Sequence, residues 1–469
     1  MSPTPTGMFH DVPIEDLFFS TTDAKGVIDE ANEVFARNSR YERSELLGAP
    51  HNIIRHPDMP GAVFKTTWDL LGAGHPVCAY VKNLARDGST YWAFATIVPI
   101  AGRFLSVRAT PCDRAARDLF ESLYQTVRRA ELAARDGGAS AHEAAEVGCE
   151  VLSQALAENG FGSYTDLQLD LVPVEVAARE AACPPLPDLP DGSKTARKIL
   201  AQVSQARNSL GAFATDIAGS LTLTDTLARD LRRLRAALTG LDSAVTSAAA
   251  APSPPAPSPP TPSPTVSPPT PAPTPGSPEP IPCVGAQAEV AALVPVIRSR
   301  LAAVGDAVGR ARDELTVVVQ ARKQLALSSA IARMQAEAIG RYVVAVETGA
   351  EDSRVSERAL SSLTTALLAI LDADLHIDRA ATTAYVDRVT RLATEVTAAR
   401  ETTLAWRSLL EDISPHESLL ALDVALRAVA DQMGRVADAV GAVAATNAAL
   451  DRDALAAALG RIVELAAKV

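Results

Sequence analysis

The chain has 469 residues, of which 47% are hydrophobic and 21% charged, and this composition predicts a packed protein with more than one domain. Its formal net charge of −12 argues against nucleic acid as the main partner, because binding to phosphates needs a basic surface. The five cysteines are scattered without a CxxC pair, which suits a reducing compartment better than a disulfide framework.

The first eleven residues are polar, and we expect them to form a flexible N-terminus. They contain no apolar core and therefore do not resemble a signal peptide. No window of about 18 apolar residues occurs along the chain, so no membrane insertion is expected. These features predict a soluble protein of the cytoplasm.

Residues 12–112 hold most of the aromatic residues and predict one small α+β domain. Runs such as DLFFSTTD, YWAFATIVPI and RFLSVRATP are rich in aromatic and β-branched residues, which favours strands. The stretches EANEVFARNS and KTTWDLLGAG favour short helices between them. The expected order is two strands, short helices and three strands.

The loop IIRHPDMP sets three ionisable residues, Arg55, His56 and Asp58, in a stiff backbone. Pro57 and Pro60 fix their own φ angles and push the preceding residues toward extended conformations. The three side chains are therefore held in defined directions. A helix-capping network of ion pairs is one interpretation of such a loop, and presentation of fixed charges to a ligand is the other.

The stretch NIIRHPDMPGAVFKTTWDLLGAGHP, followed by YVKN, DGSTYWAFATIVPI and SVRATP, closely resembles the PAS domain of bacterial aerotaxis receptors. The resemblance covers residues 12–112. In that family the domain binds FAD noncovalently and reports redox state or respiratory electron flow to a helical signalling module. The family usually has two basic residues after VKN, where this chain has Leu84 and Ala85.

The resemblance implies an FAD site, and the chemistry of the flavin assigns roles to the matching residues. Asn83 offers both a donor and an acceptor to the polar edge of the ring. Arg55 or His56 would stabilise the negative charge of a reduced ring and help to anchor the phosphates, with Asp58 orienting either cation. Three aromatic side chains would stack on the ring or wall the pocket. The candidate cofactor-binding residues are Arg55, His56, Asp58, Trp68, Asn83, Tyr91 and Trp92.

Other chemistry finds no support in the sequence. No cysteine has the helical context of a photochemical flavin sensor, and no histidine has that of an axial haem ligand. A glycine-rich phosphate loop, a kinase motif and a metal-ligand spacing are all missing. We therefore expect no catalytic residues, no bound metal and no enzymatic activity.

Residues 113–250 predict a helical, coiled-coil region. Between 199 and 245, apolar positions alternate in spacings of three and four, which is a heptad seam held over many turns. The seam consists of Val203, Ala206, Leu210, Phe213, Ile217, Thr224, Leu227, Leu231, Leu234, Leu238, Leu241 and Val245. It has no obvious partner in its own segment, so we expect a homodimer.

Residues 251–282 form a proline-rich linker, and half of them are proline. Such a segment forms neither helix nor sheet and predicts a semi-rigid polyproline spacer, with an SH3-type ligand as the alternative.

Residues 283–469 predict a second helical region with a coiled-coil hairpin, in which helices over 353–412 and 415–469 meet at ISPHES. The stretch from Gln324 to Glu351 faintly resembles the tip of chemoreceptor hairpins, which implies a degenerate chemoreceptor-like region and a possible chemotaxis-type signalling partner.

Together these features predict a cytoplasmic signal-transduction protein that senses redox or energy state through FAD in a PAS domain and signals through coiled-coil helices. The alternative is a PAS domain without cofactor that serves as the dimerisation module of a coiled-coil scaffold.

Overall fold

The computed structural model describes residues 3–250, 284–351, 356–370 and 417–448, with isolated helical positions between 391 and 465. These residues belong to two compact units. The first comprises Met1–Leu221, Val319–Arg379 and Ala449–Val469, and the second Thr222–Val318 and Ala380–Ala448. The predicted proline-rich linker at 251–282 and residues 413–416 of the predicted hairpin turn lie outside the described residues.

The first unit contains a five-stranded antiparallel sheet with the strand order β2-β1-β5-β4-β3. Its strands are β1 (Leu17–Thr22), β2 (Ile28–Ala31), β3 (Val77–Leu84), β4 (Thr90–Ile100) and β5 (Arg103–Ala109). Between β2 and β3 the chain forms α1 (Glu33–Ser39), α2 (Arg43–Leu46), a 3₁₀ turn (His51–Ile54) and α3 (Gly61–Gly72). The predicted α+β fold, with two strands, short helices and three strands, is confirmed.

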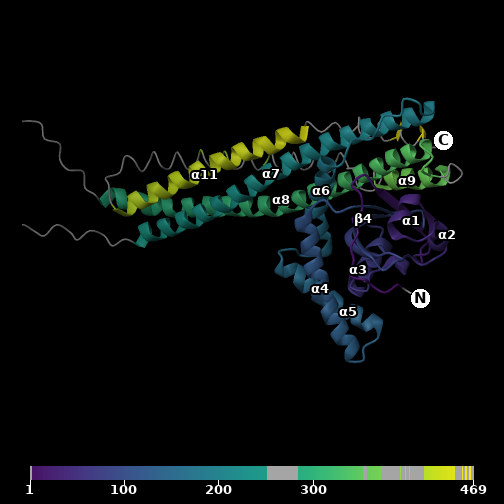
Figure 1. The fold of residues 1–469 in the computed structure, drawn as a ribbon. Helices are drawn as coiled ribbons and strands as arrows, with labels where there is room; N and C mark the ends of the chain where they lie inside the picture. Colours follow the sequence, from purple (N-terminus) through teal and green to yellow (C-terminus); the bar gives the residue numbers. More distant parts are fainter. Residues whose placement is uncertain are drawn as a thin grey trace, which may run out of the picture. The chain divides into compact units, whose positions relative to one another are not determined.

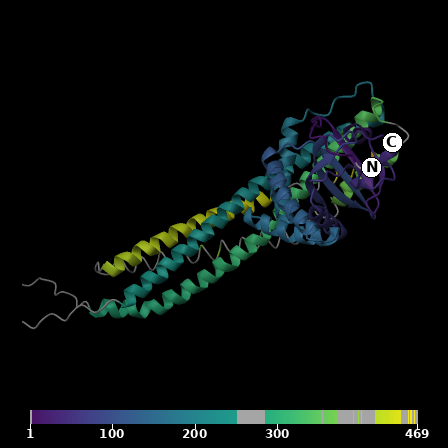
Figure 2. The ribbon, with the colours of Figure 1, turned by 60° about the horizontal axis from the view of Figure 1, so that its bottom comes forward.

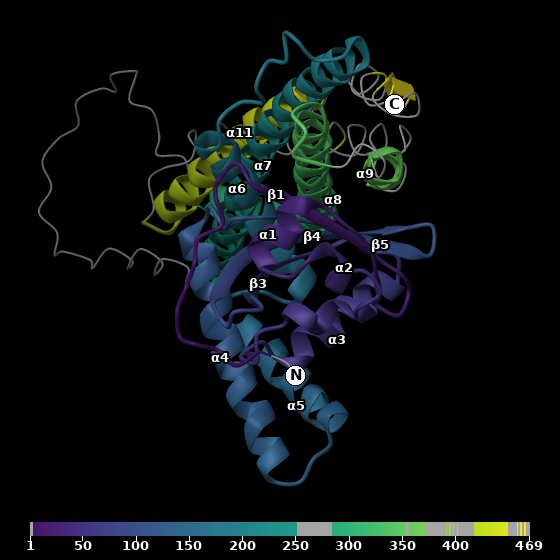
Figure 3. The ribbon, with the colours of Figure 1, turned by 45° about the vertical axis from the view of Figure 1, so that its right-hand side comes forward.

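Both faces of this sheet are buried, which explains why its strands are apolar on both sides. Successive side chains of a strand point to opposite faces. On β4, Ala95 and Ile97 face the side of α3, whereas Phe94 and Val98 belong to the core on the other side. In Figure 3 the sheet lies between α1, α2 and α3 on one face and α8 and α9 on the other.

Helix α6 (Tyr164–Ala182) protects the edge strand β3. The Gln168 side chain accepts a hydrogen bond from the Cys78 backbone N–H at 2.5 Å, and the Tyr164 hydroxyl donates to the Cys78 carbonyl at 3.0 Å. Unpaired backbone groups of an edge strand are a template for pairing with another chain. Here α6 occupies those of Cys78. The chain reaches α6 through α4 (Arg114–Asp136) and α5 (Ala141–Glu158).

The other face of the sheet packs on α8 (Val284–Glu347) and α9 (Ser356–Ile370). Gln335 of α8 donates to the Thr96 hydroxyl of β4 at 3.3 Å, and the Tyr342 ring meets Phe19 of β1 edge-on at 5.2 Å. Every residue from 327 to 340 is buried, which is typical of a helix surrounded by protein on all sides. The central part of the stretch that faintly resembles a chemoreceptor tip, residues 327–340, is therefore core in this structure.

The N-terminal segment, predicted to be flexible, is hydrogen-bonded to the β3–β4 turn and the start of β4. Thr6 N–H donates to the Gly88 carbonyl at 2.9 Å, and Thr90 N–H donates to the Met8 carbonyl at 2.8 Å. The predicted domain boundaries themselves stay predictions.

In the second unit, parts of α7 (Lys194–Ala250) and α8 run beside α11 (Glu417–Ala448), as Figures 1 and 2 show. Leu227, Leu231 and Leu234 of α7 are buried, as are Val429 and Met433 of α11. The Gln432 side chain of α11 donates to the Asp230 carbonyl of α7 at 3.1 Å. The N-terminal positions of the seam, such as Val203 and Leu210, lie in the core of the first unit.

The predicted heptad seam is thus buried by helices of the same chain. We expected a homodimer because the seam had no partner in its own segment. The homodimer stays a prediction, but its interface would have to use a different surface from this seam. Among the described helices none is long and apolar enough to cross a bilayer.

Candidate functional site

A cavity of about 250 Å³ lies between α3 and the facing side of the sheet. Its apolar walls come from α3, which contributes Val63, Phe64 and Leu71, and from the sheet, which contributes Ile97 and Phe104. Helix α3 places these residues because its buried positions recur at helical spacing. A mostly apolar cavity with a few converging polar groups is the usual form of a small-molecule site.

Trp68 stands at the mouth of the cavity. Its indole is 41% exposed and meets the Phe104 ring edge-on at 5.4 Å. It packs over Gly26 in the β1–β2 turn, where φ is +78° and an added Cβ would lie 3.2 Å from the indole. Glycine is needed there for both the turn and the close approach.

Two buried donors in the cavity lack a partner. The Asn83 Nδ2 and Ser106 Oγ atoms make no hydrogen bond within the described residues, and each side chain belongs to a residue that is 5% exposed. Leaving a buried polar group unpaired costs about 1–3 kcal/mol. Two such groups in one cavity indicate a place for a ligand with hydrogen-bond acceptors, and they fit the polar edge of a flavin.

Arg108 of β5 brings a buried positive charge to the same cavity. It is 3% exposed, and its guanidinium donates to the Ser20 hydroxyl at 3.1 Å and to His51 Nε2. Burial lowers the pKa of Arg108 to about 10. Burial and the charge of Arg108 hold the pKa of His51 well below 6.5, so its imidazole is neutral and accepts this hydrogen bond. No carboxylate among the described residues forms an ion pair with Arg108.

Arg55 also lines the cavity, since its backbone forms an antiparallel bridge with Asn83. Its guanidinium stacks over the Phe64 ring at 3.9 Å and donates to the Met59 carbonyl at 3.1 Å. Burial lowers the pKa of Arg55. The loop therefore holds this side chain flat against the apolar wall.

His56 and Asp58 point away from the cavity. His56 Nδ1 lies 3.4 Å from the Asp58 carboxylate, which accepts from Lys82 Nζ at 2.7 Å. Burial raises the pKa of Asp58, but the hydrogen bond from Lys82 and the positive charges around it together outweigh burial, so the net pKa is lowered. Burial also lowers the pKa of His56. These two residues form the ion-pair network that is the other interpretation of the loop.

Tyr91 and Trp92 are neighbours on β4 and therefore point to opposite faces. Tyr91 packs under the His10 ring at 5.0 Å in a small core beside the cavity. Trp92 lines a separate space of about 380 Å³ on the other side, next to Asp58.

The structure thus brings Arg55, Trp68 and Asn83 together at the cavity. It leaves His56, Asp58, Tyr91 and Trp92 outside its lining. Sequence reasoning missed Ser106 and Arg108, although SVRATP contains both. The sequence could have indicated Arg108, because it is a charged residue in an apolar strand and alternates to the side of the strand that faces α3.

The end of the stiff loop, where α3 begins, is hydrogen-bonded to a residue far along the chain. Glu131 of α4 accepts from the backbone N–H groups of Gly61 and Ala62, at 2.9 and 2.8 Å, and so caps the N-terminus of α3. An added Cβ at Gly148 of α5 would lie 2.6 Å from the Glu131 carboxylate. The cap therefore needs a glycine on the neighbouring helix.

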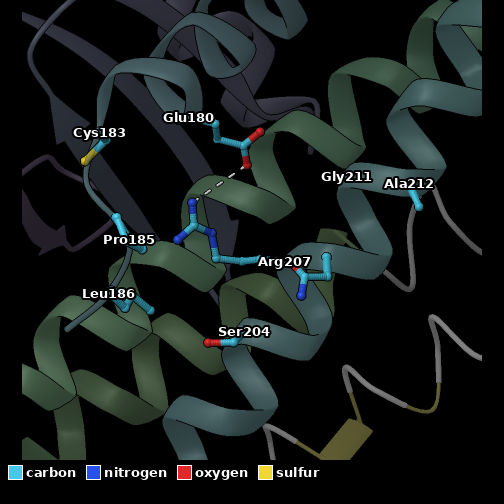
Figure 4. A pocket seen from close by; sticks show the side chains of 9 residues that line it. Glu180, Cys183, Pro185, Leu186, Ser204, Arg207, Gly211 and Ala212 are labelled. Atoms are coloured by element: carbon cyan, nitrogen blue, oxygen red, sulfur yellow. Dashed lines mark ion pairs between the residues drawn. The ribbon is translucent and has the colours of Figure 1, made fainter. Parts of the chain in front are cut away.

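A second hollow of about 570 Å³ lies between the end of α6 and α7, and Figure 4 shows its lining. Its central carboxylate, Glu180, already pairs with Arg333 at 2.6 Å and Arg207 at 4.0 Å. No group of His, Cys, Asp and Glu residues in the described part of the chain could hold a metal ion. The cavity under α3 is therefore the stronger candidate.

The sheet order, the short helices and the cavity between them agree with a comparison of protein families, in which the PAS fold matches residues 28–110. These residues form a PAS domain. Over 133 residues the chain is 36% identical to the aerotaxis receptor of Escherichia coli strain K12, covering 26% of this chain and 26% of the receptor. Over 81 residues it is 30% identical to the nitrogen fixation regulatory protein of Klebsiella pneumoniae, covering 17% of this chain and 16% of that protein. The chain therefore spans about a quarter or less of these relatives.

Solved structures similar to the PAS domain include the PAS domain of an HTR-like protein from Haloarcula marismortui. It is 23% identical with a TM-score of 0.18, covering 20% of this chain and 78% of that one. A light-oxygen-voltage domain studied with a flavin analogue is 21% identical with a TM-score of 0.21, covering 23% of this chain and 86% of that one.

Proposed function

We propose that this chain is a cytoplasmic signalling protein whose PAS domain binds a flavin, FAD, and reports its redox state to the helical region. The observation that carries the proposal is the pair of unpartnered donors, Asn83 Nδ2 and Ser106 Oγ, in an otherwise apolar cavity. A flavin ring presents apolar faces to such walls and acceptors to such donors.

The size of the cavity limits which part of FAD it encloses. About 250 Å³ is slightly below the range of ligand pockets, which span roughly 300–1,000 Å³. It suits a ring system, so the ribityl chain and the adenosine would pass the mouth beside Trp68. Leu84 and Ala85, which stand where the family usually has basic residues, are buried and offer no charge to a pyrophosphate.

The sheet gives a physical route for output. Ala95 and Ile97 face the cavity, and Thr96 between them contacts Gln335 of α8 on the other side. A change in the ring that shifts β4 therefore reaches α8 directly. Coupling of this kind needs two discrete packings of α8 on the sheet. A homodimer and a chemotaxis-type partner for the helices belong to this proposal.

The absorbance spectrum of the purified protein tests the cofactor. We expect a flavin spectrum, as purified or after addition of FAD, that bleaches with dithionite, and release of FAD on denaturation. Asn83→Ala should weaken FAD binding about threefold to tenfold, because one hydrogen bond contributes about 0.5–1.5 kcal/mol. Asp69→Asn is the control, since Asp69 is an exposed residue of α3 outside the cavity lining and its loss should leave binding unchanged.

A colourless protein that ignores FAD in titration calorimetry would overturn the proposal and favour the PAS domain as a dimerisation module without cofactor. Loss of flavin in Asp58→Asn but not in Asn83→Ala would indicate that the flavin binds on the side of the loop that Asp58 faces.

A further inference from the structure

The α3-side cavity carries an excess of positive charge that the proposed function does not explain. Its lining includes Lys25, Arg55, Lys82 and Arg108, and no lining residue is an aspartate or glutamate. Lys25 is exposed, and Lys82 already pairs with Asp58 at 2.7 Å, so these two cations say little about a ligand. Arg108 is different because it is 3% exposed.

Burying a cation is costly unless a negative or strongly accepting group compensates it. The hydrogen-bond acceptors that Arg108 has, Ser20 Oγ and neutral His51 Nε2, are uncharged. The Phe35 ring adds a cation–π contact at 5.2 Å, which is worth only about 0.5–2 kcal/mol. The chain therefore leaves this buried charge without a counter-ion among the described residues.

We infer that Arg108 stabilises the negative charge that reduction leaves on the flavin, an inference that rests on the proposed function. With a flavin bound, reduction would add two electrons from a low-potential donor such as dithionite and one proton from solvent. The product is the anionic reduced ring, with one net negative charge. A fixed, buried cation favours that product over the neutral oxidised ring.

Arg108 is better suited to this role than Arg55 or His56, the residues that the sequence suggests. The Arg55 guanidinium is held against Phe64 and bonded to the Met59 carbonyl. His56 is turned toward Asp58 and outside the cavity lining. Arg108 lies on the same strand as Ser106, two residues away, so both present donors to one region of the cavity.

The test is the midpoint potential of the flavin in Arg108→Gln, measured by anaerobic reduction against a reference dye. We expect this variant to keep oxidised flavin but to lose at least tenfold in its preference for the reduced form. For a two-electron couple, tenfold corresponds to a midpoint about 30 mV lower. Arg108→Lys, which keeps the charge, should recover most of the potential.

Arg103→Gln is the matched control. Arg103 is on the same strand but lies outside the cavity lining, paired with Asp29 at 2.8 Å. Its removal should leave the potential unchanged. An equal shift in both variants would mean that the effect is a general loss of charge and would overturn the role of Arg108.

A second readout needs no variant. The reduced flavin of the native protein should keep the absorbance of the anionic form at acidic pH values at which free reduced flavin is protonated. The other ionisable groups that line the cavity are His51, Arg55, Lys25 and Lys82, and none of them supplies negative charge. Outside the lining, Tyr91 has a raised pKa because it is buried, and the Asp58 carboxylate is paired with Lys82.

The outcomes separate this inference from the proposed function. Absence of flavin in the native protein overturns both. Bound flavin with an unchanged potential in Arg108→Gln, or a neutral reduced flavin in the native protein, overturns the inference alone.

Discussion

Single buried carboxylates hold parts of this chain that are far apart in sequence. Glu131 is 2% exposed and accepts from two backbone N–H groups of α3, while Arg128 lies 3.1 Å from it. Pro60, the residue before α3, has no side chain that can cap the helix. The start of α3, and with it one wall of the cavity, therefore depends on a residue in α4.

Replacing Glu131 by Ala should destabilise the first unit by about 2–4 kcal/mol, because two buried donors lose a charged acceptor. Urea unfolding measures this difference. Asp118→Ala is the control, since that carboxylate is on the same helix but exposed, and it should change stability by less than about 0.5 kcal/mol. Equal effects of the two changes would contradict the capping role.

Glu351 gives the first unit a dependence on pH. It is 5% exposed, its carboxylate accepts from the Glu33 N–H at the start of α1, and burial raises its pKa to about 7. An acid with a raised folded-state pKa contributes stability that is complete below its unfolded-state pKa, about 4.3, and is lost as pH rises through 7.

Glu351→Gln should therefore gain stability relative to the native protein between pH 5 and pH 8. The native protein loses up to about 3 kcal/mol over this range, at about 1.4 kcal/mol per pKa unit, and glutamine keeps the acceptor without titrating. Urea unfolding of both proteins at the two pH values measures the gain. A stability difference that is constant with pH would argue against ionisation of Glu351.

At the scale of elements, the heptad seam of α7 shows that a pattern identifies an apolar stripe but not its partner. Leu234 is fully buried, and the helix it belongs to is covered by helices of the same chain. An intramolecular seam stabilises the folded monomer, whereas an intermolecular seam makes stability depend on concentration.

Leu234→Ala should lower the unfolding free energy of the second unit by about 2–5 kcal/mol, the usual effect of a cavity in a core. The variant should keep the oligomeric state of the native protein in light scattering, because helices of the same chain cover the seam. A Leu234→Ala variant that mainly dissociates would place the seam between chains instead.

At the scale of the whole molecule, the PAS domain shares its hydrophobic core with the helical region. Its sheet and the stretch of α8 from 327 to 340 belong to one compact unit and one core, with Phe19 and Tyr342 in contact. The sheet thus covers the stretch that faintly resembles a signalling tip. A partner protein that binds this stretch of α8 would first have to displace the sheet.

Hydrogen exchange should therefore report β4 and residues 327–340 as one cooperative unit. Their backbone amides should exchange at similar slow rates, because neither is exposed without opening the shared core. Exchange of 327–340 that is much faster than that of β4 would show that α8 separates from the sheet without unfolding it.

The sequence by itself determined the features that local patterns carry. Alternation and aromatic content predicted the strands of the PAS domain, and the RHPDMP and VKN motifs pointed to Arg55 and Asn83, which line the cavity. Only the tertiary structure brought Arg108 beside them, placed Glu131 at the start of α3 and supplied the partner of the α7 seam. The physical reason is that periodicity tells which side of an element is apolar, whereas the group that meets that side comes from a distant part of the chain. Tyr91 and Trp92 show the same limit of sequence-based prediction. The sequence suggested both for one site, but neighbouring residues of β4 point to opposite faces of the sheet.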